Sequence, residues 1–416
     1  MPLPRPAFRG PALALALGAM LFCSRGAPAA EEAAEPQDVQ AQVRELIAQF
    51  DGEGMSSQVR ARAAMEKVIK IGKPAVLQLV EATRHKSPWV RLWSLATLCS
   101  IGDERAIEPA LRLMEDPHPT ARMIAVWHGS GFAARDKRIG PAVLARMADS
   151  SKDVRKWAQR AIVERKIADA EPAMEKLLDH DSGEIRLDAF ITLALLRGKE
   201  IRAMAVEVIH GGAAPKRLAT AYDALQRGWA DWPTAEFYLG ALDHAEPLVK
   251  DAGVRGLEWL LKESAQAPDP EAKERGYKRP TREQREQLYG EIERRLPPLL
   301  KSSYAPLRAH ALYLLTAGRR EALLPEIEAA LKDPAAIVRA YALGSLARAG
   351  AKDKRTIVPA LAALDDPELE VRDRAWKALQ WATDGRIGVK FDPNAPEADR
   401  RAQAEKVREA CKLFID

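Results

Sequence analysis

The residue types that most often carry chemistry, histidine and cysteine, are few in this sequence and are not spaced for a known reaction. The chain has seven histidines and three cysteines among its 416 residues. It contains no Cys-x-x-Cys, no Cys-x-x-Cys-His and no His-Glu-x-x-His, so the spacings typical of zinc sites and of covalent haem attachment are missing. We therefore predict no metal site and no cofactor site.

Two short segments imitate catalytic turns. The sequence His-Gly-Ser-Gly at 128–131 has the letters of a nucleophile turn, and His-Gly-Gly at 210–212 has those of an oxyanion loop. Both motifs require a strand immediately before the turn. Each segment here follows a stretch of helical periodicity, so we interpret its glycines as breaks between helices. No carboxylate pair stands out either, and we predict no catalytic residue and no enzymatic activity.

A set of aromatic residues recurs at fixed distances after an arginine, two or five positions along. These two positions share one face of a helix, where rings and nearby charged groups are typical anchors for a partner. The alternative interpretation is that the rings fill gaps between packed helices. The candidate partner-binding face consists of Trp93, Trp127, Trp157, Arg160, Asp188, His310, Tyr313, Tyr341, Arg374 and Lys377.

The arginines belong to a repeated phrase, in which an apolar residue precedes Arg, a small residue follows three positions later and another apolar residue about seven later. Val90-Arg91, Ser94 and Leu98 form one copy. The copies form two runs, and within each run successive arginines are 31 or 33 residues apart, a regularity that indicates a repeated structural unit. The repeat arginines are Arg91, Arg122, Arg155, Arg186, Arg308, Arg339 and Arg372.

Each phrase is predicted to begin a helix. Asp-Pro precedes it at 116–117, 333–334 and 366–367, and Ser-Pro at 87–88, which we interpret as an N-cap followed by proline in the first turn. A second helix is expected in each unit. A single helical hairpin cannot bury both of its apolar stripes, so the units must stack. The predicted fold is all-α, a right-handed α-solenoid of about ten helix pairs.

With this phrase and spacing, residues from about 55 to 383 resemble the HEAT family, and more narrowly the short HEAT-like repeats also found in phycobilin lyases. The resemblance implies that the aspartates and arginines link adjacent layers by hydrogen bonds, and that the arginine helices line the concave face. The implication is weakest at Arg122, because Ala121 replaces the usual valine.

The first 30 residues are typical of a secretory signal peptide of a bacterial exported protein. Arg5 and Arg9 precede an apolar run at 11–22, and Ala-Pro-Ala at 27–29 resembles a cleavage site. Cys23 would be lipidated only in a lipobox, and the preceding Phe22 is too bulky for one. We expect an exported protein, periplasmic or secreted after cleavage, with no transmembrane segment in the mature chain.

The remaining boundaries follow from changes in composition. We predict an N-terminal segment at 31–54, the repeat solenoid at 55–383 with a polar insertion at 263–281, and a turn-rich strip with a capping helix at 384–416. Thr281 and Gln284 fit a capping box at the end of the insertion.

The charge argues against nucleic acid as a partner. The chain has a net charge of +5, but three arginines lie in the leader, which leaves 61 basic against 59 acidic side chains and a net charge of +2. We therefore predict an exported, non-catalytic scaffold that binds a protein or peptide on its solenoid surface. Two alternatives stay open: an enzyme or enzyme subunit of the chromophore-lyase type, and a nucleic-acid-binding protein similar to the HEAT-like alkylpurine DNA glycosylases.

Overall fold

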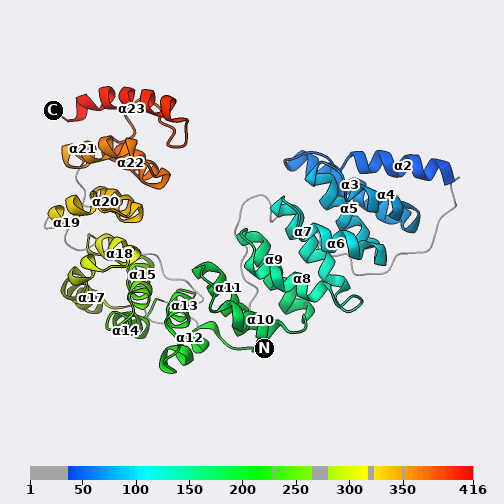
Figure 1. The fold of residues 1–416 in the computed structure, drawn as a ribbon, viewed down its shortest axis with the longest axis horizontal. Helices are drawn as coiled ribbons and strands as arrows, with labels where there is room; N and C mark the ends of the chain where they lie inside the picture. Colours follow the sequence, from blue (N-terminus) through cyan, green and yellow to red (C-terminus); the bar gives the residue numbers. More distant parts are fainter. Residues whose placement is uncertain (1–35, 228–229, 265–279, 317–322, 349–351, 416) are drawn as a thin grey trace. The chain divides into compact units, whose positions relative to one another are not determined.

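The computed structural model describes residues 36–227, 230–264, 280–316, 323–348 and 352–415, and every regular element in these ranges is a helix (Figure 1). The prediction of an all-α solenoid is confirmed. The predicted signal peptide at 1–30 and most of the predicted insertion at 263–281 lie outside the described residues. Among the helices that are described, none combines the length and apolar character needed to cross a bilayer.

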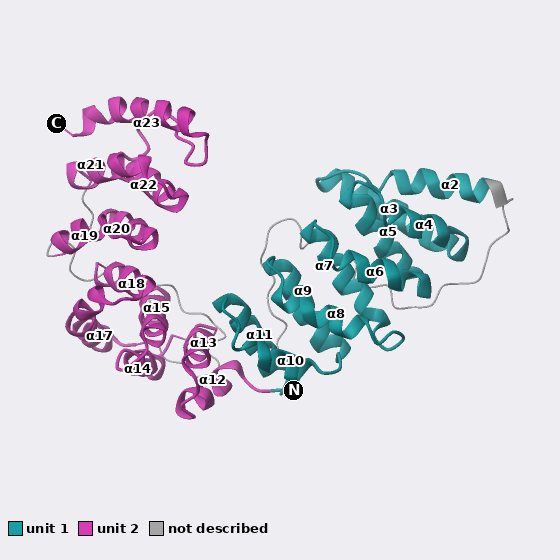
Figure 2. Ribbon diagram, viewed as in Figure 1, with its two compact units in different colours: residues 1–198 teal, residues 199–416 magenta. Residues whose placement is uncertain are grey.

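The chain divides into two compact units, residues 1–198 and 199–416, which are described separately (Figure 2). In unit 1, α2 lies within the segment 31–54 that the sequence analysis kept outside the repeats, and it packs on α3. The helices of unit 1 are α2 (Pro36–Ala48), α3 (Met55–Ile71), α4 (Val76–Ala82), α5 (Pro88–Ile101), α6 (Ile107–Leu113), α7 (Pro119–Gly129), α8 (Ile139–Ala145), α9 (Lys152–Arg165), α10 (Ala170–Leu177) and α11 (Gly183–Leu196).

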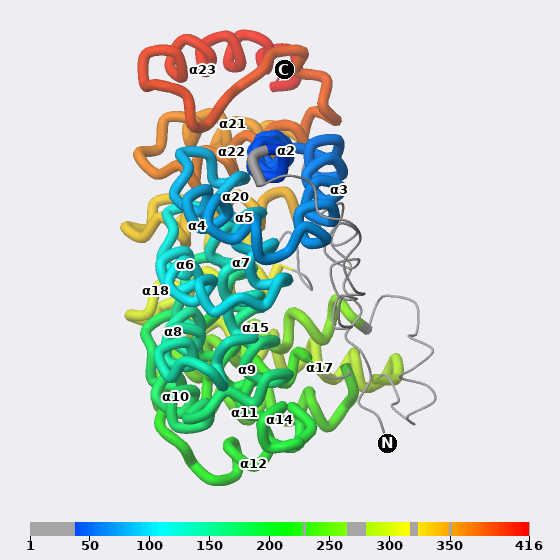
Figure 3. Tube along the Cα trace, turned by 90° about the vertical axis from the view of Figure 1, so that its right-hand side faces the viewer, coloured from blue at the N-terminus to red at the C-terminus, as the bar shows by residue number. Residues whose placement is uncertain are grey.

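Unit 2 has the same alternation of helices and ends in a helix that lies beyond α21 and α22 (Figures 1 and 3). The helices of unit 2 are α12 (Ile201–His210), α13 (Pro215–Leu225), α14 (Trp232–Ala241), α15 (Pro247–Ser264), α17 (Arg282–Arg295), α18 (Ala305–Leu315), α19 (Leu324–Ala330), α20 (Ala336–Arg348), α21 (Lys354–Ala362), α22 (Leu369–Ala382) and α23 (Glu397–Cys411).

The helices of each unit form two rows. The helices that carry the repeat phrase contact one another in succession, α5 with α7, α7 with α9 and α9 with α11 in unit 1, and α13, α15, α18, α20 and α22 in unit 2. We call these helices the arginine row. The intervening helices, such as α4, α6 and α8 in unit 1 or α19 and α21 in unit 2, form the second row (Figure 1).

The predicted helix starts are correct at one kind of site and wrong at another. Ser87 is the N-cap residue of α5, with Pro88 in the first turn, but its side chain makes no capping hydrogen bond and its hydroxyl donates to Asp51 at 2.6 Å instead. The Asp-Pro pairs are not caps, because α7, α20 and α22 begin two or three residues after them. Each aspartate instead closes a turn before the helix, as when the Asp116 carboxylate accepts the backbone N–H of His118 at 2.9 Å. The predicted capping box of α17 is confirmed.

The core of each unit lies between the two rows. Leu346, the last apolar residue of its repeat phrase, is buried, as is the neighbouring Leu343, and Leu346 packs with Leu312 and Ile327. At the end of unit 2, α23 buries Val407 and Cys411 against the cluster formed by α20, α21 and α22.

One helix pair in unit 2 approaches unusually closely. Tyr238 of α14 is fully buried, and its ring lies on the backbone of α15 at Gly256, while Gly253 faces the backbone carbonyl of Tyr238 and the side chain of Ala241. A Cβ built on Gly256 would be 2.1 Å from Cε1 of Tyr238. Only glycine permits this contact at residue 256.

We expect Gly256→Ala to lower the free energy of unfolding by about 1–3 kcal/mol, the usual cost of overpacking a core, because the buried ring has no room to withdraw. Urea denaturation followed by circular dichroism measures the change. Gly290→Ala is the matched control: residue 290 lies inside α17 with no atom within 4 Å of the new Cβ. It should gain roughly 0.5–1 kcal/mol from helix propensity. Wild-type stability in Gly256→Ala would contradict the packing described.

Candidate functional site

The repeat arginines bridge successive loops at one edge of each unit. Nε and Nη2 of Arg91 donate to the two carboxylate oxygens of Asp116, each at 2.7 Å. Its Nη1 donates to the carbonyls of His85 and Lys86, both at 2.9 Å. One guanidinium therefore holds the loop before its own helix and the loop of the next layer, using donors that a lysine lacks.

The same bidentate link recurs at three other places, including Arg122, where the sequence resemblance was weakest. The acceptor in each case is the aspartate six residues before the next repeat arginine. The four links are Arg91–Asp116, Arg122–Asp149, Arg308–Asp333 and Arg339–Asp366.

The aspartates stay ionised in this setting. Burial by itself would raise the pKa of Asp116, Asp149, Asp333 and Asp366, but the bonds from the guanidinium and from a backbone N–H outweigh it and hold each pKa below its ordinary value. The links therefore persist to acidic pH.

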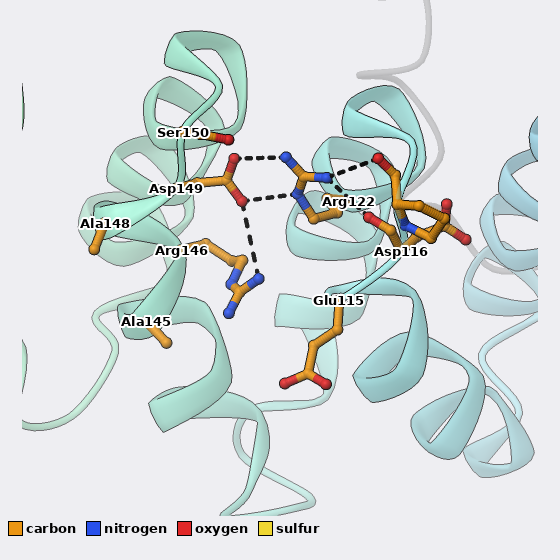
Figure 4. Close-up of a pocket in the computed structure, with 9 residues that line it drawn as sticks. Glu115, Asp116, Arg122, Ala145, Arg146, Ala148, Asp149 and Ser150 are labelled. Carbon is orange, nitrogen blue, oxygen red and sulfur yellow. Dashed lines mark hydrogen bonds and ion pairs between the residues drawn. The ribbon is translucent and has the colours of Figure 1, made fainter.

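The close-up in Figure 4 shows one of these joints and the open cleft beside it. Arg122 reaches across to Asp149, and Nη1 of Arg146 lies 3.9 Å from the same carboxylate while donating to the carbonyl of Met114 at 2.9 Å. Glu115 stands on the opposite side of the cleft. The polar groups that line it are used in joining two layers.

Where the aspartate is missing, the arginine finds another acceptor. His180 occupies that position before α11 and instead accepts the N–H of Ser182 at 3.0 Å. Arg155 consequently donates to Asp188 at 2.6 Å and Glu184 at 2.7 Å on α11. Asp188, predicted for the partner-binding face, is thus part of a layer link.

The last repeat arginine has no further repeat to bind. Nε of Arg372 donates to the carbonyl of Pro393 at 2.9 Å, and Nη1 donates to the carbonyls of Asp366 and Pro367. The bond from Arg372 to Pro393 fixes the turn-rich strip that precedes α23. Arg186 retains the bonds to its own loop, from Nη1 to the carbonyls of His180 and Asp181.

A buried polar chain joins α15, α18 and α20 of unit 2. Asp251 is 3% exposed, and its carboxylate lies 2.7 Å from Nδ1 of His310. Nε2 of His310 lies 3.2 Å from the Tyr341 hydroxyl, and Arg255 binds both Asp251 and Asp223. Because a carboxylate accepts, Nδ1 of His310 donates to Asp251, and Nε2 of the ring lies within hydrogen-bond distance of the Tyr341 hydroxyl.

This series of buried polar side chains replaces the usual arginine link. Lys250 stands where the repeat arginine is expected on α15, and Ser302 stands where the aspartate is expected before α18. The pKa of Tyr341 is raised, mainly by burial and further by Glu258, so its hydroxyl keeps its proton. Sequence reasoning missed Asp251, because its partner is 59 residues away and no local pattern announces it.

Two predicted face residues are buried and support the packing interpretation. Trp93 is 4% exposed, and its ring lies 6.5 Å from that of Phe50. His310 is 9% exposed and is held in the chain just described. The prediction of a partner-binding role is therefore corrected for Trp93 and His310.

The other aromatic residues of the predicted face remain half-buried and carry guanidinium groups. In unit 1 the rings of Trp127 and Trp157 meet edge to face at 5.1 Å, and Arg160 lies over both, at 4.6 and 5.3 Å. Nε of Arg160 also donates to Glu164 at 2.7 Å. The structure brings these three predicted residues together.

Unit 2 has a comparable group. The rings of Tyr313 and Tyr341 lie 5.6 Å apart, Arg348 lies 4.2 Å from the centre of Tyr313, and Arg374 lies 5.8 Å from that of Tyr341. Sequence reasoning missed Arg348, although it follows Tyr341 by seven residues on the same helical face. Lys377 is exposed and pairs with Asp373 of its own helix.

The segments that imitate catalytic turns follow helices, not strands: His210 ends α12 and residues 211–212 form the turn after it. Residues 128–131 span the end of α7 and the 3-10 turn Ser130–Phe132, and the Ser130 hydroxyl donates to the carbonyl of Trp127 at 2.7 Å. Within the described ranges, no group of three or more histidine, cysteine or acidic side chains is arranged to hold a metal ion.

Breaking one layer link should be costly. In Asp149→Leu the guanidinium of Arg122 loses its carboxylate in a mostly buried place, and we expect a loss of about 3 kcal/mol of unfolding free energy. The double variant Arg122→Met/Asp149→Leu should recover most of it, because no charge is then stranded. Denaturant titration measures both.

The control for the Arg122 and Asp149 variants is Glu286→Ala, which removes the partner of the exposed Arg282 and should change the free energy of unfolding by less than about 0.5 kcal/mol. Equal losses in the single and double variants would indicate that charge pairing is unimportant at this joint.

The histidine beside the tryptophan group should make stability depend on pH. Burial, and then the nearby Arg165, lower the pKa of His128 from 6.5 to about 4. Protonation therefore favours the unfolded chain. The neutral form of His128 makes its full contribution to the free energy of unfolding above pH 6.5. That free energy falls by up to about 3 kcal/mol as the pH drops towards 4. His128→Gln should flatten the stability curve between pH 6.5 and 4.5. A slope that is unchanged in this variant would contradict the assignment.

Comparison with known proteins identifies the repeat type. Residues 37–128 match the family model described as HEAT repeats. No curated protein matches the sequence. Importin β is similar at 14% identity over 89% of this chain and 55% of its own, with a TM-score of 0.33. Kap95p, from a complex with RanGDP, is similar at 11% identity over 97% of this chain and 56% of its own, with a TM-score of 0.40.

The complex of CpcE and CpcF, a phycocyanin lyase from Nostoc, is similar at 18% identity over 60% of this chain and 96% of its own, with a TM-score of 0.28. The present chain spans about half the length of the importin-type chains that it matches. The family match identifies HEAT repeats in residues 37–128, and the arginine–aspartate link found in that region recurs in unit 2.

Proposed function

We propose that the protein is an exported, non-catalytic scaffold that binds a partner protein or peptide along its arginine row. The observation that carries the proposal is the half-buried pairing of aromatic rings with guanidinium groups on this row in both units. Trp127 and Trp157 with Arg160 represent it in unit 1, and Tyr313 with Arg348 in unit 2. Tryptophan, tyrosine and arginine are the side chains that most often dominate interface energies.

The use of the other polar groups supports a binding role over catalysis. An acid–base site needs groups that can reach a substrate, and the Asp251–His310 pair is buried and committed to Tyr341. Asp188 is likewise committed to Arg155. What the arginine row offers to a partner is therefore guanidinium edges held beside half-buried aromatic rings.

The predicted leader supports export. Its basic start, apolar run and Ala-Pro-Ala site have the order of a cleavable signal. The partner would then be a protein of the envelope or of the secreted fraction. Cys99 is compatible with an oxidising compartment outside the cytoplasm. Burial raises its pKa to about 12, so that its thiol is a poor nucleophile.

Affinity capture from native envelope extract, with mass spectrometry, tests the proposal. The full chain should retain specific proteins, and the face variant Trp157→Ala/Tyr313→Ala should lose them, because an anchor of this kind contributes about 2 kcal/mol or more to binding. Circular dichroism and thermal melting verify that the variant is folded.

The matched control removes exposed apolar side chains from the second row instead. Leu77 of α4 is 70% exposed and Val358 of α21 is 50% exposed, and Leu77→Ala/Val358→Ala should retain the same proteins as wild type. If the wild-type chain retains nothing specific, or if both variants lose the same proteins, the arginine row is not the binding surface.

A further inference from the structure

We infer that the partner docks on an arginine–aromatic cluster at the ends of α7 and α9, and that the docking segment is an acidic peptide. The inference rests on the proposed function and specifies the chemistry of its partner. The cluster consists of Trp127, Phe132, Arg135, Trp157, Arg160 and Arg165.

The cluster places three guanidinium groups on ring faces of unit 1. Arg160 covers both indoles, and Arg165 lies 5.2 Å from the centre of the Trp127 ring. Arg135 lies 5.5 Å from the centre of Phe132 and donates to the carbonyl of Gly102 at 3.2 Å. Arg135 and Arg165 are exposed, whereas Arg160 is partly covered by its neighbours.

These arginines differ from the layer-linking ones in how their charge is balanced. In the bidentate layer links, one edge of the guanidinium binds a carboxylate and Nη1 binds loop carbonyls, as Arg91 does with Asp116 and with the carbonyls of His85 and Lys86. In the cluster, the three cations meet one carboxylate, that of Glu164, which pairs with Arg160. Within the described part of the chain, Arg135 and Arg165 form no ion pair.

A stacked guanidinium is prepared for a carboxylate. Stacking uses the face of the planar group and leaves the N–H donors at its rim available, so a second partner can bind in the plane by paired hydrogen bonds. The ring also fixes the side chain in advance, which reduces the entropy lost on binding. Several such groups within one cluster suit a segment with several carboxylates.

The cluster favours an acidic peptide over a nucleic acid. Single strands bind such sites by stacking bases on aromatic faces, but Arg160 and Arg165 already cover the Trp127 ring. The near-neutral charge of the mature chain also lacks the broad positive field that nucleic-acid binding requires. Donors at the rims of the guanidinium groups, rather than open ring faces, are what remains.

The positive charge of the cluster is constant over the ordinary pH range. His128 lies beside Arg165, and its pKa of about 4 keeps it neutral above that value. Binding should therefore be level from pH 8 to about 5.5, and should weaken below that only as the carboxylates of the peptide take up protons.

The test uses the full chain and a fluorescein-labelled peptide of ten glutamates, with the ten-glutamine peptide as its neutral counterpart. Fluorescence anisotropy should give at least about tenfold tighter binding of the glutamate peptide. The triple variant Arg135→Gln/Arg160→Gln/Arg165→Gln should weaken that binding by at least about tenfold. If the triple variant is misfolded by circular dichroism, the pair Arg135→Gln/Arg165→Gln, which changes only exposed side chains, is measured instead.

The matched control removes the same charge elsewhere. Arg282, Arg294 and Arg401 have side chains that are 82%, 69% and 71% exposed, and Arg282→Gln/Arg294→Gln/Arg401→Gln should bind within about twofold of wild type if the effect is local. Equal loss in both triple variants, or equal binding of the glutamate and glutamine peptides, would overturn the inference.

Two further outcomes separate this inference from the proposed function. Tighter binding of a ten-nucleotide single-stranded DNA than of the glutamate peptide, lost in the same arginine variant, would overturn the acidic-peptide assignment. Failure of the glutamate peptide, while extract proteins are still captured and still lost in Trp157→Ala/Tyr313→Ala, would overturn this inference alone. Failure of the capture experiment as well would remove both.

Discussion

The stacking of the helical layers depends on one interaction, a guanidinium that bridges two successive loops. Each hairpin has apolar stripes that fit a neighbour in more than one register, because apolar contacts are not directional. The link supplies the missing direction: one edge of Arg339 holds the carbonyls of Asp333 and Pro334, and the other edge grips both oxygens of Asp366 in the next loop. A shift by one helical turn would strand a mostly buried charge on each side. We therefore infer that the links fix the register of the layers, while the packed leucines and alanines supply most of the stabilisation.

The exceptions support the same constraint. At two places where the acceptor or the arginine is replaced, another polar bridge joins the same pair of layers. Arg155 reaches Asp188 because His180 cannot accept a guanidinium, and Asp251 with His310 joins the layers where Lys250 replaces the arginine. The bridge is thus maintained although its chemistry changes. This has a consequence for function, because a carboxylate–histidine pair that would suggest catalysis in a sequence of unknown fold is here the substitute for a structural joint.

The sequence was informative about everything periodic and less so about contacts between distant residues. The spacing of 31 or 33 residues predicted the hairpins, and the phrase around Leu346 predicted the core, because both depend on local helical geometry. The Asp-Pro caps were wrong for the same reason: a local capping rule assigns the carboxylate to the nearest helix, whereas Asp116 serves a turn and an arginine of the preceding layer. Asp251 could not have been found, since its role depends on which helix lies opposite. The burial of Trp93 depends on Phe50, a residue of the segment between α2 and α3 that the repeat pattern did not include.

The arginines of this chain fall into two populations that share a side chain and differ in their surroundings. Those of the repeat phrase are surrounded by carboxylates and carbonyls, and nearly all of their donors are used within the fold. Those that lie on aromatic rings, such as Arg165 and Arg348, have one face covered and keep donors at the rim that the fold does not use, although Nη1 of Arg348 donates to the carbonyl of Tyr313 at 3.3 Å. A guanidinium whose donors are satisfied can only stabilise, because a ligand would have to displace an existing bond of equal strength. A guanidinium that is held in place by a ring and still has unused donors can bind a ligand without breaking anything. The division of one residue type between these two environments is what allows the same row of helices to be both the structural seam of each unit and its surface for recognition.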